Sequence, residues 1–376
     1  MHILIAPNAF KNSLNATDAA RAIRSGIMES KLQCTTESFP IADGGDGTAE
    51  LIIKKLLGNI ITAEVHDPLG RIINASFGLI DNGHTAVIEM ADASGLRLLK
   101  NDPLNPLHAT SYGTGELIKM ALDKGVTRII IAMGGSATTD GGTGILEALG
   151  AGFLNDKGET LSKMPQSLID LSMIDLSAVD KRVYDCSFTV LCDVDNTLLG
   201  RAGAAAVFGP QKGASSPVVT MLEESLTKFA AITFQQTGKD ISQIKYGGTA
   251  GGAAAGLYAF LNATLSNGIE HFLRITNFEQ ALQKSNIVIT GEGSIDEQTL
   301  QGKGPFGVAA KAKKKGIKVI GIAGKVPLRP NDLDEYFDVL ISIGNEPTGI
   351  ETALQTTAAN LKRTATQIGN LLAIKH

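Results

Sequence analysis

The stretch 129-IIIAMGGSATTDGGTGILEAL-149 joins a run of isoleucines to a glycine-rich loop and then to an apolar segment with helical spacing. The isoleucine run predicts a strand that is buried on both faces. The loop that follows, residues 134–142, holds a single carboxylate, Asp140. A strand, a glycine loop and a helix in this order are typical of a parallel α/β sheet, in which such loops lie at the carboxyl ends of the strands.

The same order recurs along the chain, because short apolar runs alternate with segments of helical periodicity. The predicted buried strands are residues 2–7, 128–135, 286–293, 318–324 and 338–344. The predicted helices are residues 13–30 with Asn15 as N-cap, 48–57, 305–315 and 351–374. Strands that alternate with helices in this way predict a parallel, doubly wound α/β sheet.

Two regions interrupt the alternation. Residues 60–91 predict three antiparallel strands, and residues 151–282 combine loops, one strand at 187–194 and an Ala/Gly-rich helix. The 376 residues exceed the usual size of a single core. We therefore predict a discontinuous parallel α/β domain with an inserted mixed α+β domain. The first comprises residues 1–62, 108–150 and 283–376, and the second comprises residues 63–107 and 151–282.

Charge and cysteine content exclude several classes of function. The net charge is −4 and the longest basic run is Lys313–Lys315, which argues against nucleic acid as a partner. The three cysteines form no metal or redox motif, and no apolar segment is long enough to span a bilayer. We expect a cytoplasmic protein that binds neither nucleic acid nor membrane. A homodimer is compatible with the sequence but not required by it.

Three glycine loops each contain acidic residues, at residues 42–48, 134–142 and 290–296. Glycine allows backbone N–H groups to approach a ligand closely, and the following helix N-terminus favours an anion. The acids suit Mg²⁺, which binds carboxylate oxygens together with phosphates. Neither the P-loop motif nor a G-x-G-x-x-G motif after the first strand occurs. The loops therefore predict phosphate binding of another kind, and tight structural turns are the alternative.

Individual polar residues stand at the predicted strand ends. Lys11 follows the first strand and could pair with a phosphate or a carboxylate, or be an ordinary solvated side chain. Asp193 and Asp195 end the strand at 187–194, where two acids suit a metal or a general base, with a cap or turn as the alternative. Lys212 lies in a loop framed by glycine and proline, and Lys303 directly precedes a predicted helix.

Taken together, these segments resemble the bacterial glycerate kinase family, whose members include glycerate 2-kinases. The resemblance keeps the order of segments over essentially the whole chain. It rests on 5-IAPNAFKNSL-14, 41-IADGGDGT-48, 110-TSYGTGELI-118, 133-MGGSATTDGG-142, 192-CDVDNTLLG-200 with 208-FGPQKGA-214, and 289-ITGEGSIDEQTLQGK-303. It implies a flavodoxin-like or Rossmann-like domain with an inserted domain, and phosphorylation of D-glycerate by ATP with Mg²⁺.

In the light of this resemblance we assign roles to the loop residues as hypotheses. The predicted catalytic residues are Asp193, as base or metal ligand, with Lys11 and Lys212 holding a phosphate or the glycerate carboxylate. The predicted nucleotide- and phosphate-binding residues are Gly134, Gly135, Ser136, Thr138, Gly291, Glu292, Gly293 and Lys303. The predicted substrate-binding residues are Ser13, Asp43, Gly44 and Lys325. The predicted metal ligands are Asp193, Asp140 and Asp296, and Asp43, Asp140 and Asp296 are rivals of Asp193 for the role of base.

The chain departs from the family pattern at several positions. Asn8 and Ala9 stand where the family usually has Asp and Ser, and Ser294 stands where it usually has Arg. We hypothesise that Lys325 restores the positive charge missing at Ser294. Three further departures are Asp46 for Glu, Thr139 for Asn and Thr197 for Pro. The alternatives left open are a glycerate 3-kinase, a kinase of another small hydroxy acid, and an inactive ligand-binding or regulatory homologue.

Overall fold

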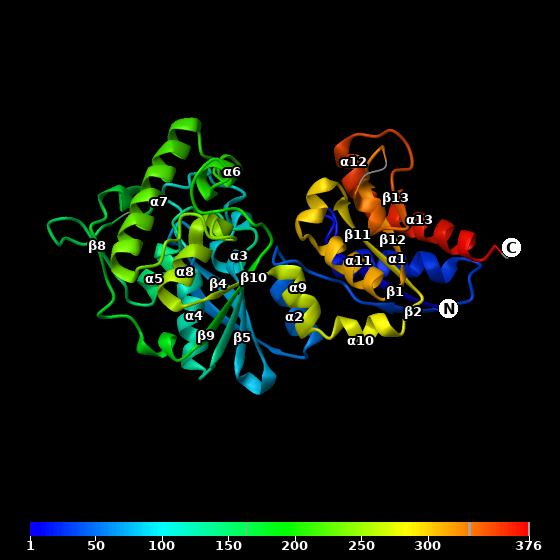
Figure 1. Cartoon of the computed structure of the whole chain (residues 1–376), viewed down its shortest axis with the longest axis horizontal. Helices are drawn as coiled ribbons and strands as arrows, with labels where there is room; N and C mark the ends of the chain where they lie inside the picture. Colours follow the sequence, from blue (N-terminus) through cyan, green and yellow to red (C-terminus); the bar gives the residue numbers. More distant parts are fainter. Residues whose placement is uncertain (163, 330–331, 375–376) are drawn as a thin grey trace. The chain divides into compact units, whose positions relative to one another are not determined.

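The computed structural model describes residues 1–162, 164–329 and 332–374 (Figure 1). The chain divides into two compact units. Unit 1 comprises Met1–Asp43 and Ile269–His376, and unit 2 comprises Gly44–Gly268. Unit 1 is therefore built from both ends of the chain, with unit 2 inserted between them.

Unit 1 contains a five-stranded parallel sheet in the order β13-β12-β11-β1-β2. Its strands are β1 (His2–Pro7), β2 (Thr35–Ser38), β11 (Ile287–Ser294), β12 (Lys318–Lys325) and β13 (Val339–Ser342). Numbered along the chain within this unit, the order is 2-1-3-4-5, which is the flavodoxin-like arrangement. The order of the strands reverses between β1 and β11, so this is the point where a ligand is expected.

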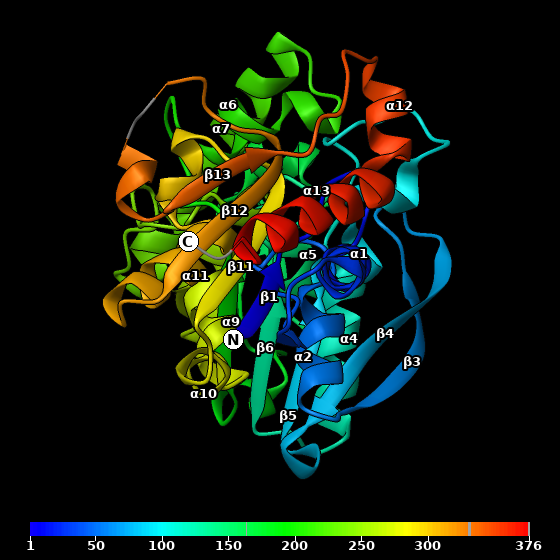
Figure 2. The same ribbon diagram turned by 90° about the vertical axis from the view of Figure 1, so that its right-hand side faces the viewer.

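Helices cover both faces of this sheet. They are α1 (Ala16–Glu29), α9 (Gly268–Ile275), α10 (Phe278–Gln283), α11 (Gly304–Lys314), α12 (Ile350–Gln355) and α13 (Thr357–Leu372). Helices α1 and α13 lie side by side (Figures 1 and 2) and share an apolar cluster with Ile3 and Ile5. Helix α11 packs against β1, β11 and β12 without belonging to that cluster, so it covers the opposite face.

The helices agree with the sequence-based predictions in most respects. Asn15 caps α1, because its side chain accepts a hydrogen bond of 2.8 Å from the backbone N–H of Asp18. The single helix predicted at 351–374 is two helices, which meet at Thr356. The periodicity of the apolar residues continues across this junction, so it could not reveal the break.

Unit 2 contains a six-stranded mixed sheet in the order β10-β9-β6-β5-β4-β3. Its strands are β3 (Asn59–His66), β4 (Ile72–Ile80), β5 (Thr85–Glu89), β6 (Arg128–Ala132), β9 (Ser187–Cys192) and β10 (Thr264–Asn267). The pairs from β10 to β5 are parallel, and β4 pairs antiparallel with both β5 and β3. The three antiparallel strands predicted at 60–91 are thereby confirmed. A separate hairpin pairs β7 (Gly152–Leu154) with β8 (Met173–Asp175).

The helices of unit 2 surround this sheet and complete its core. They are α2 (Thr48–Lys55), α3 (Met90–Ser94), α4 (Tyr112–Asp123), α5 (Thr143–Ala148), α6 (Ala204–Phe208), α7 (Ser216–Thr237) and α8 (Ala253–Leu261). Among the residues that the structure describes, no helix is both long and apolar enough to cross a membrane.

The observed division corrects the predicted domain boundaries. Residues 44–62 and 108–150 belong to unit 2, although we grouped them with the chain ends, and residues 269–282 belong to unit 1. The reason is the pairing of β6, which joins β5 and β9 and not β1. Buried parallel strands carry similar apolar runs, so the pattern within β6 did not identify its neighbours.

The contact between α1 and α13 predicts a packing-sensitive position at Gly26. A Cβ atom there would overlap the carbonyl oxygen of Lys362 and the Cβ of Ala365. We expect Gly26→Ala to lower the free energy of unfolding by about 1–3 kcal/mol, despite the better helix propensity of alanine. Urea denaturation of the full chain measures this change.

Gly349→Ala is the matched control. Gly349 has a φ of −67° and a Cβ there would meet no atom within 4 Å. Its substitution should change the stability by less than about 0.5 kcal/mol. Equal losses in the two variants would show that the close approach of α1 and α13 does not limit stability.

Candidate active-site residues

In unit 1, the carboxyl ends of β1 and β11 bring two predicted loops together. Pro7 pairs with Gly291, and the backbone N–H of Asn8 donates a 2.8 Å hydrogen bond to the carbonyl of Gly291. Glu292 therefore lies beside the loop that contains Asn8, at the reversal in strand order. Open parallel sheets bind their ligands at this place.

Asn8 connects this loop to Asp43, the last residue of the first segment of unit 1. Its Nδ2 donates to Oδ2 of Asp43 at 2.8 Å, and its Oδ1 accepts from the backbone N–H of Ala9 at 2.8 Å. The same carboxylate oxygen of Asp43 accepts from the N–H of Gly304, the first residue of α11, at 3.4 Å. Asp43 thus links the end of β1 to the start of α11.

Glu292 has a strongly altered ionisation. Its pKa is raised to about 8, first by burial and then by the negative charge of Asp43, against the opposing charge of Lys303. The hydroxyl of Thr299 lies 3.4 Å from Oε1 of Glu292. The carboxyl group is therefore largely neutral at pH 7 unless a cation approaches it.

Lys11, Lys303 and Lys325 supply positive charge in this unit. Lys303 precedes α11, while Lys11 and Lys325 are exposed. Lys325 is paired in register with Ser294 on the adjacent strand, and its carbonyl accepts from the N–H of Ile295 at 2.9 Å. This register supports the hypothesis that Lys325 replaces the charge absent at Ser294.

Two other predicted site residues of unit 1 make structural contacts. The hydroxyl of Ser13 donates to the carbonyl of Leu354 in α12 at 2.5 Å. Asp296 accepts from the hydroxyl of Ser294 at 3.0 Å. The roles predicted for them in substrate and metal binding stay predictions, and these contacts favour a structural contribution.

In unit 2, the loops after Asp43 and after β6 pack against each other through their backbones. The N–H of Gly134 donates to the carbonyl of Gly44 at 2.9 Å. A Cβ on Gly134 would overlap Gly45, and Gly135 has a φ of +73°. Glycine is therefore required here by close packing and by backbone conformation, independently of any ligand.

Lys212 is buried against the loop that follows β6. Its Nζ donates to Oγ of Ser136 at 3.0 Å and to the carbonyl of Thr138 at 2.5 Å. Burial lowers the pKa of Lys212 to about 8, while the charges of Asp140 and Asp193 act in the opposite direction. The structure thus brings together four residues that the sequence analysis singled out separately: Ser136, Thr138, Asp193 and Lys212.

Asp140 is fully buried and holds the start of α5. Its Oδ2 accepts from the N–H of Ser111 at 2.8 Å, the hydroxyl of Ser111 at 2.6 Å and the N–H of Gly144 at 3.3 Å. Its Oδ1 accepts from the N–H of Gly142 at 3.0 Å. With both oxygens engaged, Asp140 acts as a structural cap, and its predicted role as a metal ligand receives no support from these contacts.

Sequence reasoning missed two polar residues that shape these loops. Ser111 donates to Asp140, and the buried Glu89 accepts from the N–H groups of Gly47 at 2.6 Å and Ala49 at 3.1 Å. Burial raises the pKa of Glu89. In the sequence, Glu89 could have been recognised as a carboxylate at the end of the run 85–89.

Two threonine hydroxyls in the loop 134–142 have unmet hydrogen-bonding capacity. Within the described part of the chain, Oγ1 of Thr138 and Oγ1 of Thr139 are buried and have no partner. Buried polar atoms rarely remain unpaired without a ligand or water. The described residues contain no group of three or more His, Cys, Asp or Glu side chains placed to hold a metal.

Comparison with known proteins identifies the family of this chain. A sequence model described as the glycerate kinase family matches residues 3–373. The chain belongs to the glycerate kinase family. It is 43% identical over 367 residues to a glycerate kinase of Halalkalibacterium halodurans, covering 97% of each chain. It is also 43% identical to the glycerate 2-kinase of Escherichia coli K12, covering 100% of this chain and 98% of the relative.

A solved structure supports the same membership. The chain superimposes with a TM-score of 0.83 on a crystal structure of a candidate glycerate kinase 2 from Salmonella typhimurium LT2. The two sequences are 42% identical, and the match covers 99% of this chain and 98% of the other. The two-domain α/β architecture is therefore that of a glycerate kinase fold.

Membership in the glycerate kinase family gives the departure at Asn8 a physical meaning. An aspartate at position 8 would put a second carboxylate against Asp43, where this chain has an amide that donates a hydrogen bond. Asn8 therefore removes one negative charge from the surroundings of Glu292. The loss lowers the repulsion among the acids at this strand end.

The raised pKa of Glu292 predicts a pH-dependent stability. Because the folded-state pKa of about 8 exceeds the ordinary value of 4.5, the stabilisation is complete below pH 4.5 and is lost as the pH rises towards 8. In metal-free buffer, the melting temperature of the native chain should therefore fall more between pH 5 and 8 than that of Glu292→Gln. Thermal denaturation over this pH range measures the difference.

Glu297→Gln is the control, since Glu297 is exposed and lies nearby on the chain. The melting temperature of Glu297→Gln should depend on pH in the same way as that of the native protein. If the melting temperatures of the native protein and of Glu292→Gln changed equally with pH, the raised pKa of Glu292 would be contradicted.

Proposed function

We propose that the chain is an ATP-dependent kinase that phosphorylates the 2-hydroxyl of D-glycerate with Mg²⁺ as cofactor. The observation that carries the proposal is the similarity over the whole chain to a relative named glycerate 2-kinase. The residues at the strand ends of each unit are consistent with phosphoryl transfer. This reaction depends mainly on positioning the reactants and on stabilising the charge that develops on the phosphate.

In unit 2, Lys212 and Asp193 form the centre of the proposed chemistry. Lys212 is buried, so its charge is little screened by solvent, and it can hold the carboxylate of glycerate or a phosphate. Asp193 is close enough to Lys212 to affect its pKa. In our proposal Asp193 accepts the proton of the attacking hydroxyl, while the unpaired hydroxyls of Thr138 and Thr139 supply donors for an anion.

In unit 1, the glycine loop after β11 and its lysines suit the phosphates of ATP. Gly293 is exposed, so its backbone is accessible, whereas Gly291 is buried against Ile322. Lys11 and Lys303 both lie near Glu292. These features support the assignment of this loop to phosphate binding. In this proposal Lys325 stabilises negative charge on the phosphates, in place of the arginine that is absent at Ser294.

The carboxyl groups of unit 1 fit a magnesium ion. Mg²⁺ in kinases is usually held by one or two carboxylates together with phosphates and water. Asp43 and Glu292 are close enough for the charge of Asp43 to raise the pKa of Glu292, and a divalent cation would relieve this repulsion. We propose these two residues as ligands, with Asp296 as the alternative within unit 1; Asp193 is an alternative ligand in unit 2. The ion would neutralise charge on the phosphates.

A kinase of another small hydroxy acid is the second candidate. It is favoured by Ser294, which lacks the charge that the family usually has there, and by the amide of Asn8 against Asp43. The register of Lys325 beside Ser294 argues for glycerate, because a positive charge remains available on the adjacent strand.

A coupled assay tests the proposed product. The chain is supplied with D-glycerate, ATP and Mg²⁺, together with enolase and without a mutase. We expect phosphoenolpyruvate to appear at the rate of ADP release, because enolase acts on 2-phosphoglycerate. ADP release without phosphoenolpyruvate would indicate the 3-hydroxyl, and authentic 3-phosphoglycerate with enolase is the control. A panel of other hydroxy acids, assayed for ADP release, tests the second candidate.

Substitution of Asp193 tests its role as base. We expect Asp193→Asn to lower kcat by about 10²–10⁴-fold, the range typical of general-base catalysis. Asp195→Asn is the matched control, because Asp195 is exposed and lies two residues further along. Its kcat should stay near the native value. If Asp193→Asn kept more than about a tenth of the native kcat, the assignment would be wrong.

A further inference from the structure

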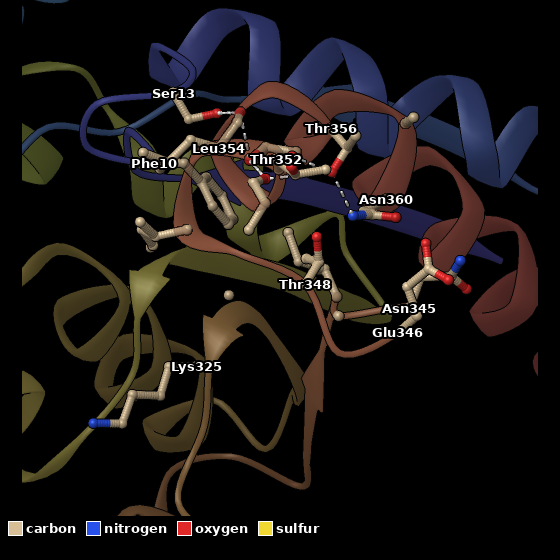
Figure 3. A pocket seen from close by; sticks show the side chains of 18 of the residues that line it. Phe10, Ser13, Lys325, Asn345, Glu346, Thr348, Thr352, Leu354, Thr356 and Asn360 are labelled. Carbon is tan, nitrogen blue, oxygen red and sulfur yellow. Dashed lines mark hydrogen bonds between the residues drawn. The ribbon is translucent and has the colours of Figure 1, made fainter.

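Unit 1 contains a cavity of about 380 Å³ beside the carboxyl ends of β12 and β13 (Figure 3). The loop that follows β1 closes one side, and the segment from Gly344 through the start of α13 closes the other. Its volume lies within the range of about 300–1,000 Å³ that is usual for small-molecule sites. Lys11, Gly293 and Lys325, to which roles are assigned above, belong to its lining, but no role is assigned above to the residues after β13 that line it.

The lining of the cavity combines apolar walls with exposed polar groups. Phe10, Ile343 and Leu354 contribute apolar surface. Asn345, Glu346 and Thr348 contribute polar side chains, and all three are exposed. Apolar walls with a few polar groups are typical of small-molecule and cofactor sites.

The lining also contributes positive charge and glycine backbone. It includes Lys11, Lys325, Gly293 and Gly324. Figure 3 shows that the Lys325 side chain extends away from Thr348, Asn345 and Glu346. A ligand that spans the cavity would therefore meet amide, hydroxyl and carboxylate groups at one end and Lys325 at the other.

We propose that this cavity binds the adenosine part of ATP and directs its phosphates towards Lys11 and Lys325. This assignment rests on the proposed function as an ATP-dependent kinase. An adenine ring matches the apolar walls, and Glu346 and Asn345 can accept hydrogen bonds from its amino group or from the ribose hydroxyls. The phosphates then extend towards the loop with Gly293, near the reversal in strand order between β1 and β11.

The other substrate fits this cavity less well. Every carbon of glycerate carries an oxygen, so the apolar surface of Phe10, Ile343 and Leu354 would have no apolar partner. A three-carbon acid is also too short to contact both ends of a 380 Å³ cavity. The chemistry of the walls therefore selects the nucleotide.

A substitution that fills the cavity tests the assignment. Thr352 lines the cavity from α12 and is exposed, so Thr352→Phe adds volume there without breaking a side-chain bond of the core. Titration calorimetry with ADP and the full-length chain measures affinity. We expect Thr352→Phe to weaken ADP binding at least about tenfold and to raise the KM for ATP, with the KM for D-glycerate within about twofold of native.

Gln355→Phe is the matched control. Gln355 is exposed on the same helix and does not line the cavity. It should bind ADP as the native chain does, which separates filling of the cavity from damage to α12. Lys325→Ala should also weaken ADP binding, since it removes a charge from the phosphate end.

The outcomes distinguish the cavity from the overall function. If the native chain phosphorylates D-glycerate and Thr352→Phe binds ADP with native affinity, the cavity assignment is overturned and the proposed function stands. A change in the KM for D-glycerate with unchanged ADP affinity would also overturn it. If ADP binding is lost in Thr352→Phe but the native chain does not phosphorylate D-glycerate, the cavity assignment stands and the proposed function fails.

Discussion

The pairing of β1 with β11 is the constraint on which unit 1 depends. It joins residues 284 positions apart, such as Thr290, whose hydroxyl donates to the carbonyl of Ala6 at 2.7 Å. This parallel pair fixes the reversal in strand order, and thereby sets Asn8 beside the backbone of Gly291. Asp43, Glu292 and the lysines become neighbours only because this pair forms. The nucleotide cavity lies on the same edge of the sheet, at the ends of the next strands.

In unit 2, close backbone packing between two glycine loops sets the positions of the candidate site residues. Gly134 donates to Gly44, and a Cβ on Gly134 would overlap Gly45. The loop 134–142 is held from both sides, by Asp140 at the start of α5 and by Lys212 at Ser136 and Thr138. In our proposal this loop binds an anion, and its existing contacts would leave little order to be gained on binding.

Electrostatics distinguishes this chain from the usual family pattern. At the end of β1, an amide replaces a carboxylate and lowers the negative charge near Glu292. At the ends of β11 and β12, a lysine on one strand stands beside the serine that replaces an arginine on the other. Both positions lie at the strand ends of unit 1, so we expect them to affect ionisation and ligand affinity there.

The sequence alone determined the strands at 2–7, 286–293 and 318–324, the cap at Asn15, and the glycine loops that carry the site. These features are local, because apolar periodicity and glycine placement depend on neighbouring residues. It did not determine that β6 pairs with β5 and β9, since buried parallel strands share one pattern. The domain boundaries were therefore predicted incorrectly.

Only the tertiary structure shows which contacts the loop residues make. Asp140 is engaged by Ser111 and by its own helix, while Lys212 reaches Ser136 across 76 positions of the chain. Whether an acid or a lysine in a glycine loop faces a ligand depends on which distant groups surround it. The surroundings of each side chain are set by burial and by contacts between segments far apart in the chain. The local pattern of residues does not predict these contacts.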